Sequence, residues 1–159
     1  MLILGVFSGY HDACACVFED YRMRSAVAQE RLTRRKIDGG RVPVEAIDAC
    51  LEIAGATRGD IDAVVLGNAA FPWRYYNHFT GGRMIEGRVR RLIGREKHKS
   101  MERELIRAGL SDAGAIFRAD VFRSDMGLRD DVAVSFFNHH QAHALPCLFH
   151  TDWRDGLLY

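Results

Sequence analysis

Residues 2–29 read LILGVFSGYHDACACVFEDYRMRSAVAQ and predict three short strands in quick succession. The expected strands are residues 2–7, 13–18 and 23–29. The links Ser8 to Asp12 and Glu19 to Tyr21 are short and rich in small and polar residues, as turns are. Three strands joined in this way suggest an antiparallel meander.

The pattern then changes to helical spacing. The apolar residues that recur at this spacing are Val44, Ile47, Cys50, Leu51 and Ala54. Pro43 suits the first turn of such a helix and Gly55 suits its end. Residues 61–66 predict a fourth strand and residues 132–136 a fifth, after which Asn138 can cap a helix through HHQAHAL.

This order predicts an α/β fold with a mixed sheet: three strands, a helix, a strand, an insertion, a strand and a helix. It fits the ribonuclease-H-like half of an actin-like ATPase domain, within one domain that spans residues 1–159. The last residues, 155–159, resemble the start of a further strand. We therefore expect the chain to be the front piece of a longer protein, because an unfinished sheet edge is costly in water.

Residues 70–130 interrupt the strand and helix rhythm with aromatic and basic stretches. Between Arg74 and Arg107 there are ten Lys or Arg against four Glu. We expect a mostly helical, basic insertion. Its charge fits either a solvated helical face over aromatic anchors or a lid that attracts a phosphate-bearing substrate. No RNA-binding motif accompanies the charge, so nucleic acid is not a predicted partner.

Composition sets limits on function. The 159 residues are 48% hydrophobic and 27% charged with a net charge of +1, which fits one globular domain without a strong overall field. No apolar run approaches the roughly 20 residues of a membrane-spanning helix. The cysteines, Cys14, Cys16, Cys50 and Cys147, form no CxxC pair and are expected to be reduced core residues of a cytoplasmic protein.

Two polar groups of residues are candidates for chemistry. His139 and His143 lie one helical turn apart after the fifth strand, so both imidazoles can face one divalent ion, although two locally hydrogen-bonded histidines are the alternative. His11 and Asp12 occupy the first turn, where a histidine can accept a proton and a carboxylate can orient it. A polar turn in which Asp12 binds its own backbone is the alternative there.

Four segments together resemble a known family. They are ILGVFSGYHDACA at 3–15, AQERLTRRK at 28–36, PVEAI at 43–47 and FNHHQAHA at 137–144. In this order they resemble the amino-terminal, Kae1-like part of O-carbamoyltransferases of the nodulation and antibiotic-tailoring type. The HxxxH segment is more distantly similar to that of tRNA threonylcarbamoyl-transferring and hydrogenase-maturation proteins.

The resemblance implies a two-stage reaction. A YrdC-like domain makes carbamoyl-adenylate from carbamoyl phosphate and ATP, and the actin-like domain passes the carbamoyl group to a hydroxyl of a sugar or other small molecule. It also implies that His139 and His143 bind a metal, commonly iron, with zinc or magnesium as alternatives. His11 is implied as the general base, and Asp12 belongs to the same turn. The basic segment 29–36 either meets phosphates or forms local salt bridges.

The chain departs from the family pattern in two ways. The third metal ligand, an aspartate in a glycine-rich turn, and the YrdC-like domain are both expected beyond residue 159. We therefore expect weak metal binding and no complete reaction without the missing part, supplied in cis or in trans. The alternatives are a tRNA threonylcarbamoyl-transfer protein and a non-catalytic fragment that binds a metal or a partner.

Overall fold

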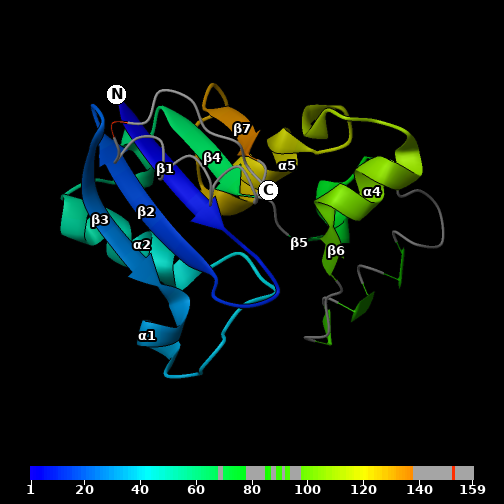
Figure 1. Cartoon of the computed structure of the whole chain (residues 1–159), viewed down its shortest axis with the longest axis horizontal. Coiled ribbons are helices and arrows are strands. Elements are labelled where there is room, and N and C mark those ends of the chain that lie inside the picture. Colours follow the sequence, from blue (N-terminus) through cyan, green and yellow to red (C-terminus); the bar gives the residue numbers. More distant parts are fainter. Residues whose placement is uncertain are drawn as a thin grey trace.

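A five-stranded mixed sheet forms the centre of the fold, in the order β3-β2-β1-β4-β7 (Figure 1). The computed structural model describes residues 1–67, 70–77, 85–86, 89–90, 92–93, 98–137 and 152. The sheet strands are β1 (Leu2–Phe7), β2 (Cys14–Glu19), β3 (Arg22–Ala28), β4 (Ala63–Gly67) and β7 (Ala133–Phe137). The first three pair antiparallel, which confirms the meander, whereas β4 is parallel to β1 and β7 to β4.

The two hairpin turns differ in length. Asp20 and Tyr21 alone join β2 to β3, with φ angles of 45° and 68°, the left-handed conformation that suits a two-residue hairpin. The third strand has the predicted length but begins and ends one residue earlier than predicted, at Arg22 and Ala28. Gln29 instead opens the short helix α1 (Gln29–Thr33), while its backbone N–H still donates to the Ala13 carbonyl at 2.8 Å.

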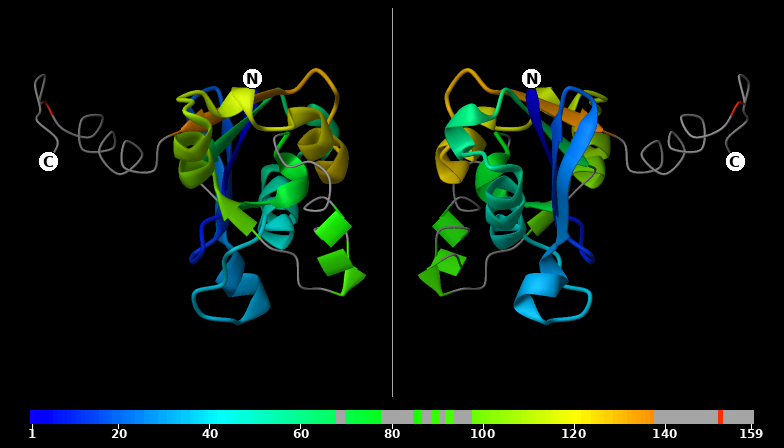
Figure 2. Two further views of the ribbon diagram at one scale, coloured as in Figure 1. Left: turned by 90° about the vertical axis from the view of Figure 1, so that its right-hand side faces the viewer. Right: turned by 90° about the vertical axis from the view of Figure 1, so that its left-hand side faces the viewer.

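Helix α2 (Val44–Ala54) covers one face of the sheet and packs against β2 and β3 (Figure 2). Its apolar side chains meet the buried alternate positions of the strands, such as Leu4 and Val17. The helix ends at Gly55, whose φ of 67° suits a residue without a Cβ, as the sequence predicted. The opposite face of β1 and β2 is only partly buried by the described residues.

The region between residues 70 and 130 contains strands as well as helices. Strand β5 (Ala70–Pro72) pairs antiparallel with β6 (His98–Ser100), and α4 (Met101–Ala108) and α5 (Ala119–Met126) follow. Short 3-10 turns complete the described elements: η1 (Arg58–Asp60), η2 (Trp73–Tyr75) and η3 (Ala113–Ala115). Strands of three residues are too short to show a period of two, which is why the sequence predicted a mostly helical insertion and no strand here.

Five aromatic rings join this region to the central sheet. Phe117 is their centre, because its ring lies 4.9 to 5.7 Å from those of its four neighbours. The neighbours are Phe71, Tyr75, Phe122 and Phe136. Since Phe136 belongs to β7, the cluster fixes the insertion against the last strand of the sheet. In the part of the chain that the structure describes, no helix has the length and apolar character needed to cross a bilayer.

Three of the four cysteines lie in the described part, and all three are free thiols. Burial, together with the nearby Cys14 and Cys50, raises the pKa of Cys16 from 9.0 to about 11. The unfolded chain therefore loses this proton at lower pH than the folded chain, so the Cys16 contribution to stability is present below about pH 9 and lost as the pH rises toward 11.

We expect the free energy of unfolding to fall across this window by on the order of 1 kcal/mol more in the parent chain than in Cys16→Ala. Urea unfolding at pH 8 and at pH 10.5 measures this fall in both proteins. An equal fall in the two proteins would show that the Cys16 thiol is not protected from ionisation. Cys147 lies outside the described residues.

Candidate functional site

The carboxyl ends of β1, β4 and β7 meet at one edge of the sheet, because these three strands are parallel. The turn that holds His11 leaves this edge after Phe7, and the chain leaves it again after Phe137. Open α/β sheets place their ligands at such an edge. His139 and His143 follow Phe137 in the sequence but lie outside the described residues, so the structure does not test their role.

His11 and Asp12 form a contact pair in the first turn. The His11 Nδ1 lies 2.7 Å from the Asp12 Oδ2, and the two side chains are 63% and 62% exposed. Asp12 has a φ of 54°, a left-handed conformation that Asp tolerates better than most residues. When Nδ1 carries the proton it donates to Asp12, which leaves Nε2 unprotonated and able to accept a proton from a hydroxyl.

The loop that follows α1 lies against this turn. The Ala13 N–H donates to the Asp38 carbonyl at 2.9 Å, and the Gly40 N–H donates to the Gly9 carbonyl. The Asp38 carboxylate accepts a hydrogen bond from the Thr33 hydroxyl at 2.6 Å, which, with Arg41 close by, lowers the pKa of Asp38. Sequence reasoning missed this loop, because its contacts run through backbone atoms and leave no residue pattern.

The basic segment is only partly neutralised. Arg31 lies 3.7 Å from Glu30, whereas Arg34 and Lys36 are exposed and form no ion pair with any described residue. Arg35 helps to lower the pKa of Asp38 but does not reach it as an ion pair. These cations can therefore meet an anion from outside the described part of the chain.

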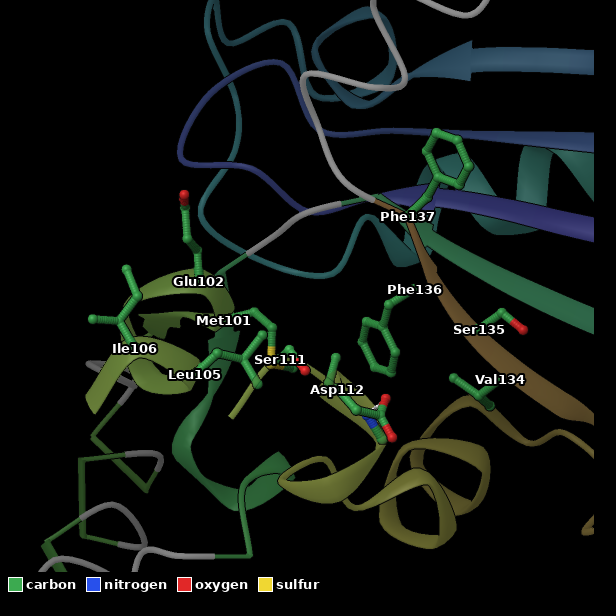
Figure 3. A pocket seen from close by; sticks show the side chains of 12 residues that line it. Met101, Glu102, Leu105, Ile106, Ser111, Asp112, Val134, Ser135, Phe136 and Phe137 are labelled. Atoms are coloured by element: carbon green, nitrogen blue, oxygen red, sulfur yellow. Dashed lines mark hydrogen bonds between the residues drawn. The ribbon is translucent and has the colours of Figure 1, made fainter. Parts of the chain in front are cut away.

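A cavity of about 540 Å³ lies between α4, η3 and β7, next to the same edge of the sheet. Figure 3 shows Phe136 pointing into it beside Met101 and Asp112. Leu105 and Val134 extend the apolar wall. The sequence carried no signal for this cavity, because its walls come from segments that are distant along the chain.

No group of three His, Cys, Asp or Glu side chains able to hold a metal is present among the described residues. The described residues thus show a His11-Asp12 pair in an exposed turn, unpaired cations in the segment 29–36 and a cavity at the same edge of the sheet. The family model for the amino-terminal part of carbamoyltransferases matches residues 2–151.

The chain belongs to the carbamoyltransferase family.

This result confirms the resemblance predicted from the four segments. Nodulation protein NolNO of Sinorhizobium fredii is 27% identical over 150 residues, which cover 93% of this chain and 19% of that protein. An uncharacterized Synechocystis protein is 38% identical over 63 residues, which cover 40% of this chain and 10% of that protein. The carbamoyltransferase chain described here therefore corresponds to a small part of the length of these relatives.

Proposed function

We propose that this chain is the amino-terminal part of an enzyme that transfers a carbamoyl group from carbamoyl-adenylate to a hydroxyl of a sugar or other small acceptor. The family match over residues 2–151 is the observation that carries the proposal. The alignment with NolNO over 93% of the chain supports it. The strand order β3-β2-β1-β4-β7 supports the finer fold assignment, a ribonuclease-H-like, actin-like half-domain.

His11 is the general base in this proposal. The acceptor oxygen attacks the carbamoyl carbon, a C–O bond forms, the bond from that carbon to the adenylate oxygen breaks, and AMP leaves. The proton of the acceptor hydroxyl passes to His11 Nε2, while Asp12, 2.7 Å from Nδ1, holds the ring and stabilises its charged form. The exposure of the pair at the sheet edge leaves room for an acceptor.

The phosphate of the adenylate fits the cations of the basic segment. Arg34 and Lys36 have no ion-pair partner among the described residues, which favours phosphate binding over a local salt bridge for these two. His139 and His143 are the proposed metal ligands. Two imidazoles are a donor set that suits iron or zinc better than magnesium. Such an ion, when bound, would supply positive charge to the adenylate phosphate.

The rest of the enzyme is a further part of the proposal. The alignment covers only 19% of NolNO. The remaining length is consistent with a carboxyl-terminal remainder and a YrdC-like domain, which would act in cis or in trans. Carbamoyl phosphate and ATP are the proposed donors of the group and of the energy. Loss of bound metal in the complete protein after His139→Ala and His143→Ala would support the ligand assignment.

The test is to incubate the complete gene product with labelled carbamoyl phosphate, ATP, a panel of sugars and, separately, tRNA with threonine. We expect label on a hydroxylated small molecule and none on tRNA. Label on tRNA alone would support the alternative function, threonylcarbamoyl transfer to tRNA. The ten basic residues between Arg74 and Arg107 are the feature that favours this alternative. Metal binding without any labelled product would support a non-catalytic module.

A further inference from the structure

The turn that carries His11 is held from both sides by the loop of residues 38–40. On the amino-terminal side, the Gly9 carbonyl accepts the N–H of Gly40. On the carboxyl-terminal side, the Ala13 N–H donates to the Asp38 carbonyl at 2.9 Å, and the Ala13 carbonyl accepts the N–H of Gln29 at 2.8 Å. Both backbone polar groups of the buried Ala13 are therefore satisfied, and the His11-Asp12 dipeptide lies between two fixed points.

Gly39 is the point of closest approach. A Cβ at this position would lie 2.6 Å from both the Cα and the backbone N of His11, and 2.8 Å from the Gly9 carbonyl oxygen. These are backbone atoms, which cannot rotate away as a flexible side chain can. Any residue other than glycine must therefore displace the loop or the turn that carries His11.

A polar network anchors the loop to α2. Arg41 lies 3.3 Å from the Asp38 carboxylate and 3.2 Å from that of Glu45. Glu45 accepts a hydrogen bond of 2.6 Å from the amide of Gln29, which is fully buried. The Gln29 amide oxygen in turn accepts the N–H of Ala46, in the first turn of α2, at 3.0 Å. Gln29 is the buried member of this network, and its pairing with Glu45 and Ala46 fixes the start of α2. The partly exposed Arg41 then links Asp38, in the loop, to this helix.

We infer that residues 38–40 form a positioning loop that sets the place of His11 for proton transfer, with Gly39 as the decisive contact and Arg41 as its anchor. The inference rests on the proposed role of His11 as general base. Residues 38–40, which follow the basic segment 29–36, would thus contribute to turnover without touching the substrate.

The test uses Gly39→Ala in the complete carbamoyltransferase. Gly55→Ala is the matched control, because it has a φ of 67° and its Cβ would meet no atom within 4 Å, so it adds backbone strain far from His11. A displacement of about 1 Å at a reacting group costs roughly 10²-fold, so we expect kcat to fall by about 10- to 100-fold in Gly39→Ala with little change in KM. Gly55→Ala should stay within about twofold.

A double variant separates positioning from general loss of structure. Once His11 is Ala, Gly39→Ala should lower kcat no further, because the base that it misplaces is gone. An equal fall in both backgrounds, or a fall no larger than that of Gly55→Ala, would overturn the inference. Thr33→Val, which removes the 2.6 Å hydrogen bond to Asp38 and the 3.2 Å bond to the Gln29 carbonyl, is a milder second variant and should lower kcat in the same way.

Hydrogen exchange distinguishes a failure of this inference from a failure of the proposed function. The amide of Ala13 should exchange about tenfold faster or more in Gly39→Ala than in the parent, whether or not carbamoyl transfer is observed. Unchanged exchange would show that the loop does not hold the turn. If His11→Ala leaves kcat unchanged, the base assignment and the positioning role fall together, while transfer to a hydroxyl acceptor stands.

Discussion

His11→Ala is expected to slow carbamoyl transfer by the complete enzyme by about 10²- to 10⁴-fold, the usual contribution of a general base. The acceptor hydroxyl would then have to lose its proton to water while the carbamoyl carbon is attacked. The effect should fall on kcat and on kcat/KM alike, because the proton moves only in the transition state. Initial rates with labelled carbamoyl phosphate at saturating ATP measure it.

Stability should not change with this substitution. The His11 side chain is 63% exposed, and surface replacements usually alter stability by no more than about 0.5 kcal/mol. Asp12→Asn keeps the tolerance for a positive φ and should lower the rate less than His11→Ala, since it removes only the group that orients the ring. Glu52→Gln, on the exposed side of α2, serves as the control and should behave as the parent. A fully active His11→Ala enzyme would rule out this residue as the base.

Phe117→Ala is expected to cause the largest loss of stability, about 3–5 kcal/mol. The side chain is 5% exposed and its ring touches four other aromatic rings, so truncation removes buried area and leaves a cavity that its neighbours can only partly fill. Aromatic pairs add about 0.5–1.5 kcal/mol each beyond the area that they bury. Such a loss is a large share of the free energy of unfolding of a native domain, which is typically about 5–15 kcal/mol.

Urea unfolding measures this effect as a lower midpoint with an unchanged slope. Phe117→Leu fills more of the space and should cost less than Phe117→Ala, which keeps the prediction testable if the alanine variant does not fold. Ile106→Ala, at a side chain that is 73% exposed, should leave the midpoint nearly unchanged. A similar midpoint for Phe117→Ala and Ile106→Ala would show that the cluster does not join the insertion to β7.

Much of the fold could be predicted from local patterns. Two strands in residues 2–29 are apolar runs bounded by short turns, and the helix before Gly55 has a period of 3.6; both signals depend on neighbouring residues alone. The boundary at Gln29 could not be predicted from local residues, because the contacts of Gln29 are with Ala13 and Glu45, which are distant from it in the sequence. The pairing of β5 with β6 was not predicted for a related reason, since the two strands are short and far apart in sequence.

Three properties follow from residues that are close together or from ordered motifs: the meander, the adjacency of His11 and Asp12, and membership of the carbamoyltransferase family. Two others depend on packing in three dimensions: Gly39 lies against the backbone of His11, and Phe117 joins Phe71 to Phe136. Such contacts arise when packing brings distant segments within van der Waals distance. The pattern of residue types along one segment does not predict which distant atoms will pack against it.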